Sequence, residues 1–192
     1  MKQNRTLVVG LTLVAFSVLS TLVGWLWTPY DPLEMNPDVS FARPSMSHLL
    51  GTDVFGRDVL SNIMIGARST LVVALVSVLI GVVLGSVVGV ATALAPAKVR
   101  QLSVFGIDIV LALPSVLFAI VLAAVYGAST LTATIAIGIA LSAAIAQVTR
   151  RETSQVLRSD YVAAAKVSGS GTRQIIRLHV LPNILPSLLV QA

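Results

Sequence analysis

Few side chains in this sequence have the type and spacing needed for catalysis or metal binding. The chain has no cysteine, which excludes a disulfide framework, a thiolate zinc site and a cysteine nucleophile. Its two histidines, His48 and His179, lie far apart and neither belongs to an H-E-x-x-H or comparable pattern. We therefore predict no catalytic residue and no metal site. Asp108 is the one acidic residue within a predicted apolar span, where an ionised carboxylate costs about 3 kcal/mol or more at mid-membrane.

Two interpretations of Asp108 are open. An intramembrane enzyme would need a second carboxylate, a serine with a base or a metal, and no apolar run supplies one. A helix starting near Leu102 would place Asp108 about 9 Å along its axis, close enough to the interface to reach water or Arg100. This position favours a structural role over a functional one. Pro114 is expected to kink the same helix and to serve as a hinge.

The composition indicates that these residues are positioned by membrane helices. Of the 192 residues, 56% are hydrophobic and 11% are charged, and the mean hydropathy is +0.92. A bilayer core of about 30 Å needs roughly 20 apolar residues of helix. The charge-free runs predict a single all-α transmembrane domain, a polytopic helical bundle with spans at 6–27, 70–95, 102–125, 131–148 and an incomplete 183–192. The last run is about half the length of a span, so we expect a chain truncated within a fifth helix, or a fragment of a longer subunit.

The basic residues predict the orientation. With the N-terminus in the cytoplasm, ten Lys and Arg residues fall inside and only Arg43, Arg57 and Arg68 fall outside. The pI near 10.2 is thus explained by topology rather than by nucleic-acid binding. A secretory signal peptide is the competing interpretation of the N-terminus. The apolar run is longer than usual, however, and no small-x-small cleavage site follows it before Trp25, Trp27 and Tyr30, which resemble interfacial anchors.

Residues 28–68, the proline-rich segment, are predicted to form an outer loop. Half of the prolines of the chain lie there, at Pro29, Pro32, Pro37 and Pro44, which excludes a regular helix over that stretch. Two glycines five residues apart then flank a short aspartate, a composition suited to two consecutive tight turns. We predict a structured loop rather than a ligand site, and the missing oxygen ligands exclude an EF-hand. The residues of this second stretch are Gly51, Thr52, Asp53, Gly56, Arg57 and Asp58.

Three glycines at four-residue intervals, Gly81, Gly85 and Gly89, form a small-residue ridge in the second predicted span. Such a ridge lets another helix backbone approach closely, so a helix-packing role is predicted. The neighbouring helix belongs either to this chain or to a partner subunit.

Residues 150–182, the basic segment, are predicted to form a cytoplasmic loop. The segment contains six basic and two acidic residues. Residues 160–168 are predicted to form a short helix, and the glycines of 169–171 end it. Thr172 is a plausible N-cap of a second short helix that runs through Arg177 and stops at Pro182. Two short helices around a small-residue elbow suit insertion into a groove of a partner, because alanines permit close approach.

Other interpretations of the basic segment are that it only fixes topology, lies on anionic lipid or binds a phosphate at its glycines. The phosphate interpretation is the weakest, because there is no G-x-x-x-x-G-K-[ST] pattern and no preceding strand. The chain itself is therefore not expected to bind ATP through a Walker loop.

The two segments together resemble a known family. Ala164-Ala165, Gly169 and then His179 to Pro182 resemble the E-A-A-x(3)-G-x(9)-I-x-L-P loop of bacterial ABC importer permeases. The stretch from Leu50 to Asp58, continued by Ser61 and Gly66 to Arg68, is similar to a signature of the dipeptide, oligopeptide and nickel branch. The resemblance extends from Arg5 to Ala192. This chain departs from the pattern at Ala163 in place of Glu, His179 in place of Ile and Asn62 in place of a basic residue.

The resemblance implies a type I importer permease subunit of the bacterial inner membrane, with six spans in the complete subunit. Its expected partners are a second homologous permease, two ATP-binding subunits that carry the ATP and Mg²⁺, an extracytoplasmic substrate-binding protein and membrane lipid. No cofactor on this chain and no nucleic-acid partner are expected. The substrate would be a dipeptide, an oligopeptide, nickel or a related chelate. The residues implied in ATPase coupling are Asp160, Tyr161, Ala163, Ala164, Ala165, Gly169, Arg177, Leu181 and Pro182. A passive pore or a lipid-binding scaffold without ATPase coupling is the alternative function.

Overall fold

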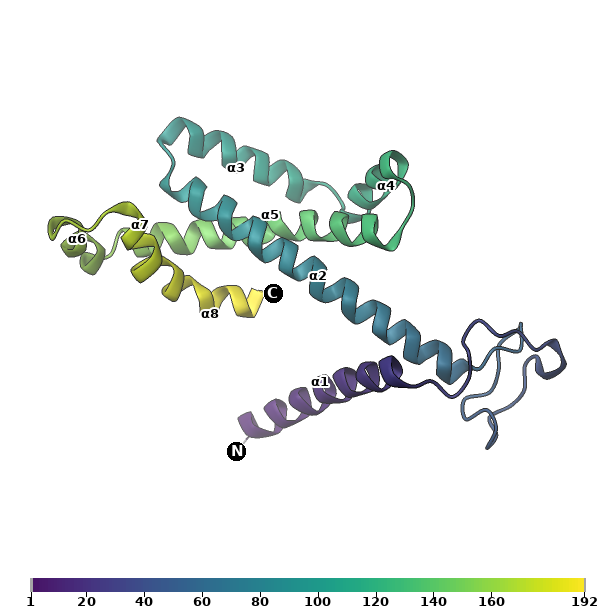
Figure 1. Cartoon of the computed structure of the whole chain (residues 1–192). Helices are drawn as coiled ribbons and strands as arrows, with labels where there is room; N and C mark the ends of the chain where they lie inside the picture. The colour runs from purple at the N-terminus through teal and green to yellow at the C-terminus, as the bar shows by residue number, and fades with distance from the viewer. Residues whose placement is uncertain (1, 192) are drawn as a thin grey trace. The chain divides into compact units, whose positions relative to one another are not determined.

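The computed structural model describes residues 2–191, and every regular element within that range is helical. An isolated antiparallel bridge between Thr52 and Asp58 is the one β-type pairing in this part of the chain. The predicted all-α membrane fold is confirmed. The elements, labelled in Figure 1, are α1 (Lys2–Leu26), the 3₁₀ turn η1 (Pro37–Val39), α2 (Val59–Leu94), α3 (Ala97–Ala112), α4 (Ser115–Tyr126), α5 (Thr130–Leu157), α6 (Asp160–Val167), α7 (Thr172–Ile175), the π-helical turn η2 (Ile176–Val180) and α8 (Leu181–Gln191).

Three helices among the described residues are long and apolar enough to cross a membrane: Arg5–Leu26 of α1, all of α2 and all of α5. A fourth crossing is formed by α3 and α4 if that pair is counted as one broken span. The chain divides into two compact units, one ending at Val73 and the other beginning at Ala74.

In the first unit, α1 suits a lipid environment over most of its length. Its apolar side chains are largely exposed, from Leu7 to Leu26. The hydroxyls of Thr12 and Ser17 donate to the carbonyl oxygens four residues earlier, at 2.8 and 2.9 Å, so these polar groups are satisfied within the helix. α1 comes close to the first turns of α2 at Gly24, where an added Cβ would lie 3.0 Å from the carbonyl oxygen of Met64.

In the second unit, α2 packs on α5 through the predicted glycine ridge. A Cβ added to Gly85 would lie 2.6 Å from the carbonyl oxygen of Ser142, and one added to Gly89 would lie 2.6 Å from Cβ of Thr149. A Cβ added to Gly81 would lie 2.9 Å from Cβ of Leu141. Because each contact is shorter than ordinary van der Waals distance, only a glycine fits at these positions without moving a helix. The neighbour of the ridge is therefore a helix of this chain.

The break between α3 and α4 lies at Pro114. Leu113 has an extended backbone, as expected before proline, and Pro114 has no N–H to continue the helical hydrogen bonds. The axes of α3 and α4 differ by 89°, so the expected kink is a complete break of the helix. Asp108 lies on an exposed face of α3 and forms no side-chain hydrogen bond or ion pair with any residue in the range 2–191. α4 ends at Tyr126 and α5 begins at Thr130, so the chain turns between the predicted spans 102–125 and 131–148.

Two helices extend beyond the spans predicted for them. α2 begins at Val59 rather than near residue 70, and α5 continues to Leu157 rather than ending near residue 148. Charge-free runs mark the part of a helix that fits the bilayer core. They do not mark where the helix ends, because Arg68 and Arg150 are good helix formers and no proline or turn interrupts the chain beside them.

The α2–α5 contact yields a stability prediction. Replacing Gly85 with alanine is expected to lower the free energy of unfolding by about 1–3 kcal/mol, because the new methyl group overlaps Ser142 and Ile145. Gly66→Ala is the matched control in the same helix, since a Cβ there meets nothing within 4 Å. The melting temperatures of the purified chains in detergent, followed by circular dichroism, would measure the difference. Equal melting of the two variants would contradict the packing described here.

Candidate functional site

The basic segment folds onto one end of α5 in the second unit (Figure 1). Val162 of α6 and Val180 of η2 are fully buried, and Ile175 of α7 is 2% exposed. They share an apolar cluster with side chains of α5 and α8, whose members are Ile145, Val156, Ile184 and Leu188. The three short elements are thus fixed to a long membrane helix through their apolar side chains, and α8 shares the same core.

α6 ends in a glycine C-cap that fixes the elbow. Gly169 has φ +87°, its N–H donates to the carbonyl of Lys166, and the Ser170 N–H donates to the carbonyl of Ala165, both at 3.0 Å. These two bonds make a Schellman motif, which needs a left-handed residue at the position of Gly169. A Cβ at Gly169 would meet nothing within 4 Å. Glycine is therefore required by the backbone conformation and not by packing within this chain.

α6 exposes the side opposite Val162. Ala163 and Ala164 are exposed, Ala165 is partly buried and Val167 is 91% exposed. Asp160 lies in the first turn, where its charge favours the helix dipole. Because the alanine side chains are small, this exposed surface is nearly flat. Val167 adds an apolar group at its end.

Further exposed side chains of the segment are apolar or basic. Tyr161, Leu178 and Leu181 are each about half exposed, and the Tyr161 ring lies 5.8 Å from the His179 ring. Pro182 is also exposed. Arg158, Lys166, Arg173 and Arg177 are exposed, and none forms an ion pair within residues 2–191. The surface therefore offers apolar and cationic groups together, without internal acidic partners.

Two local predictions for this segment are wrong. Gly171, rather than Thr172, is the N-cap of α7, and no side chain caps that helix. Pro182 does not stop the second helix, which continues through η2 and α8 to Gln191. In η2 the Leu181 N–H donates to the carbonyl of Ile176, five residues earlier. This wider turn places Pro182 in the first turn of α8, where a missing N–H is tolerated. No residue pattern in this stretch indicates a π turn.

The proline-rich segment is a compact loop built on two left-handed glycines. Gly51 has φ +77° and Gly56 has φ +72°. A Cβ at Gly51 would lie 2.4 Å from the carbonyl oxygen of Ala42, and one at Gly56 would overlap the carbonyl of Asn36. Glycine is thus required twice over at both positions, by conformation and by space. The two tight turns predicted from the sequence are present.

Asp53 closes the turn between these glycines. One carboxylate oxygen accepts from the N–H groups of Phe55 and Arg57, at 2.8 and 3.0 Å. The other accepts from Nε of Arg57 at 2.8 Å and pairs with its terminal nitrogen at 2.7 Å. Desolvation raises the pKa of Asp53, but these hydrogen bonds and the charge of Arg57 outweigh it and leave the pKa below its ordinary value of 3.8.

Asp58 joins the loop to α2. Its Oδ2 accepts from the backbone N–H and the hydroxyl of Ser61, both at 2.8 Å, as an N-cap does, and its Oδ1 lies 3.1 Å from Nδ1 of His48. The side chain is 1% exposed. Burial raises the pKa of Asp58, but the hydrogen bonds from Ser61 and His48 prevail and the pKa lies below 3.8.

Sequence inspection missed the partners of Asp58. The His48 ring stacks on Tyr30 at 4.7 Å, the Tyr30 hydroxyl donates to the carbonyl of Ser47 at 2.6 Å, and the Tyr30 N–H donates to the Ser61 hydroxyl at 3.1 Å. Thr52 holds the same loop by accepting from the Ala42 N–H at 2.8 Å. No periodic pattern links these residues, so only their distance in space reveals the network.

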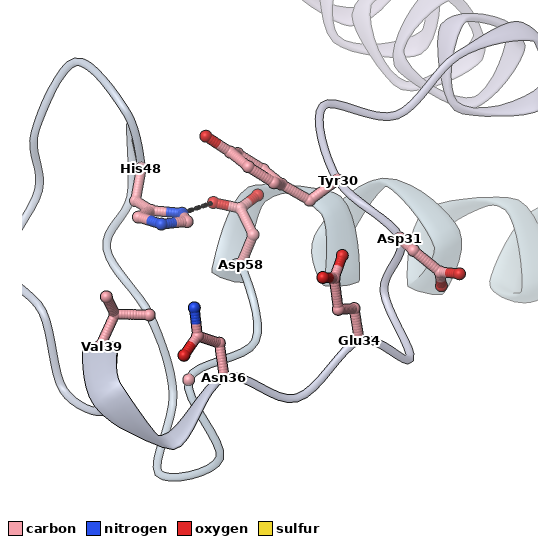
Figure 2. Close-up of a pocket in the computed structure, with 8 residues that line it drawn as sticks. Tyr30, Asp31, Glu34, Asn36, Val39, His48 and Asp58 are labelled. Carbon is pink, nitrogen blue, oxygen red and sulfur yellow. Dashed lines mark hydrogen bonds and ion pairs between the residues drawn. The ribbon is translucent and has the colours of Figure 1, made fainter.

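A hollow of about 120 Å³ lies beside this network (Figure 2). Its lining includes three carboxylates, two of which, Asp31 and Glu34, lie outside the His48–Asp58 pair. Among residues 2–191 no group of three His, Asp or Glu side chains is placed to hold a metal ion. The network orders the loop and fixes it to α2.

The chain matches a protein family described as "Binding-protein-dependent transport system inner membrane component" over residues 81–192. It is 35% identical, over 98% of its length, to the di/tripeptide transport system permease protein DppC of Pseudomonas aeruginosa strain UCBPP-PA14, of which it covers 64%. It is 36% identical over its whole length to the dipeptide transport system permease protein DppC of Escherichia coli K12, of which it covers 66%. It is 31% identical over 99% of its length to the protein of that name in Haemophilus influenzae strain Rd, again covering 66%. The chain thus spans a little under two thirds of the length of these relatives.

The Asp58 network yields a stability prediction for the loop. Asp58→Ala is expected to destabilise it by about 1–3 kcal/mol, because the buried Ser61 N–H and the His48 ring lose their acceptors. Hydrogen exchange of peptides covering residues 30–58, followed by mass spectrometry, would show faster exchange by tenfold or more. Asp31→Ala is the control, since that exposed side chain accepts only from the nearby Leu33 N–H. Similar exchange in both variants would contradict a fixing role for Asp58.

The lowered pKa of Asp58 also yields a pH dependence. Its folded pKa lies below the unfolded value, so ionised Asp58 stabilises the loop above about pH 3.8, and this contribution is lost as the pH falls through the folded pKa. Exchange of residues 30–58, corrected for the intrinsic rate, should therefore rise below about pH 3.8. The rise should be smaller in Asp58→Ala, which retains only the same-signed contribution of Asp53. An identical pH profile in the two proteins would refute the assignment to Asp58.

Proposed function

Because the chain belongs to the family of inner-membrane components of binding-protein-dependent transport systems, we propose that it is a permease subunit of an ATP-driven ABC importer for short peptides. The observation that carries this proposal is the agreement between relatives named as dipeptide and di/tripeptide permeases and an exposed, rigidly anchored basic segment. The relatives' names favour a peptide over nickel as the substrate.

In this proposal the basic segment is the coupling loop. The exposed alanines of α6 and the apolar side chains of Val167, Leu178 and Leu181 enter a groove of a cytoplasmic ATP-binding subunit. Alanine suits such a contact because its small side chain lets a partner backbone approach closely. The unpaired cations of the segment would meet acidic groups at the rim of the groove. Ala163 provides no carboxylate at the position where the family motif has Glu, so the contact here relies on shape and on these cations.

Chemistry is proposed to lie in the partners. Two ATP-binding subunits bind ATP and Mg²⁺, and their closure moves the docked segments. Val162, Val180 and Ile184 join the segment to the end of α5, so its displacement is passed to the membrane helices. A second homologous permease completes the translocation path. An extracytoplasmic binding protein delivers the peptide to the side that carries the proline-rich loop, with its Gly51 and Asp58 turns.

The orientation is part of the proposal. The N-terminus and the basic segment are assigned to the cytoplasm, because ten of the thirteen Lys and Arg residues then lie inside. The proline-rich segment, with five of the eight acidic residues, is assigned to the other side.

Site-specific crosslinking tests the docking. The chain has no cysteine, so Ala164→Cys introduces a single thiol on the exposed side of α6. Expressed with its transport partners and crosslinked in native membranes, this variant should form an adduct with an ATP-binding subunit, identified by mass spectrometry. Ala128→Cys is the matched control, since it is also exposed but lies in the turn between α4 and α5. An ordered chain with no such adduct, or equal adducts from both positions, would refute the coupling assignment.

A further inference from the structure

Two arginines line a hollow between the start of α3 and the last third of α5. The hollow measures about 340 Å³ and is lined by Ala97, Arg100, Gln101, Val104 and Arg150. All five belong to the second unit, and the start of α3 lies at the same end of that unit as the end of α5 (Figure 1). No acidic residue contributes to the lining. The hollow therefore presents two positive charges and no negative one.

The buried part of Arg150 lacks a hydrogen-bond partner. Its Nε is shielded from solvent and donates to no atom of residues 2–191. A buried charged donor without an acceptor costs more than an ordinary lost hydrogen bond. Neither Arg150 nor Arg100 forms an ion pair in the described part of the chain. An anionic group in the hollow would supply acceptors for the guanidinium groups of the two arginines that line it.

The start of α3 adds a further positive contribution. Its N-cap is Pro96, which provides no side-chain acceptor, so the first N–H groups of this 16-residue helix remain available at Ala97. The positive end of the helix dipole thus points toward the same region as the two guanidinium groups. Together, the two cations and the helix N-terminus favour the binding of an anion with several acceptor oxygens. A phosphate group has that chemistry.

The position in the sequence identifies the source of the phosphate. Arg150 follows directly after the charge-free run 109–149, and Arg100 lies just beyond the run 69–97. Both are therefore at the boundary between apolar helix and water, where lipid headgroups lie. A second hollow, of about 330 Å³, begins one turn further along both helices at Ser103 and Ala146 and is mostly apolar. It provides room for part of an acyl chain beyond the headgroup.

We propose that Arg100, Arg150 and the first turn of α3 bind the phosphate of an anionic phospholipid at this end of the helix bundle. The site shares only Arg150 with the basic segment, does not include the exposed alanines of α6, and requires only that the chain lies in a membrane. A bound headgroup would neutralise the partly buried Arg150 and hold the start of α3 against α5.

Native mass spectrometry of the purified chain with added dioleoyl phosphatidylglycerol tests the proposal. The double variant Arg100→Gln/Arg150→Gln is expected to bind this lipid about tenfold more weakly or worse. Lys98→Gln/Arg151→Gln is the matched control, because it removes the same charge from neighbouring exposed positions that do not line the hollow. Its affinity should change less than twofold. Dioleoyl phosphatidylcholine, with the same chains and no net charge, should bind the unaltered chain more weakly.

Three results would overturn the proposal. An equal loss in both double variants would mean that the lipid senses only the charge of this region. Displacement of the lipid by millimolar inorganic phosphate would identify a site for free phosphate. Unchanged binding in Arg100→Gln/Arg150→Gln would mean that the two guanidinium groups do not bind the lipid and that their partner is an acidic side chain of another subunit. If circular dichroism shows that this variant does not fold, Arg150→Lys replaces it. That variant keeps the charge and loses the planar guanidinium that can bind a phosphate with two hydrogen bonds, so a severalfold weaker affinity is expected and an unchanged one refutes the site.

Discussion

The close contact of α2 with α5 determines how the second unit is assembled. Within a membrane, apolar surface gives little drive for one helix to associate with another, so association depends on how closely the backbones approach. Gly81, Gly85 and Gly89 remove the side chains that would hold α2 away. The same principle applies on the opposite helix, α5. A Cβ added to Gly138 would lie 2.7 Å from Cβ of Ile80. Buried Ser77 adds a hydrogen bond to the carbonyl of Thr134 at 2.9 Å.

With α5 held by α2, the end of α5 can serve as a platform. The cluster of Val156, Val162, Ile175, Val180 and Ile184 joins one membrane helix to three short elements and to the start of the next helix. A force applied to α6 is resisted by buried apolar contacts rather than by surface charges, which are weak and screened by salt. This arrangement separates two tasks within 23 residues of basic segment, 160–182: one face anchors and the other is available to a partner.

The sequence predicts the membrane helices well because their signal is strong and local. Long charge-free runs and the glycine ridge depend only on spacing along one helix, and a left-handed glycine such as Gly169 or Gly51 is indicated by its own residue type. The features that were missed depend on tertiary contacts or on hydrogen-bond register. His48, Tyr30 and Ser61 meet Asp58 only after the loop has folded, and the π turn at Ile176–Val180 has no residue-type signature. The charge-free runs also do not mark where α2 begins or α5 ends, since the bilayer limits hydrophobicity and not helicity.

The π turn sets the phase of everything that follows it. Successive residues of an α-helix are offset by about 100°, so one extra residue in a turn rotates the next helix by that angle about its axis. Ile184 and Leu188 of α8 are buried beside Val180 because η2 contributes that rotation. Removing a single residue between Gly169 and Pro182 would turn these side chains away from α5 and bring exposed neighbours such as Leu185 inward. The number of residues in this stretch therefore sets the rotation of α8 about its own axis, independently of the identity of most of those residues.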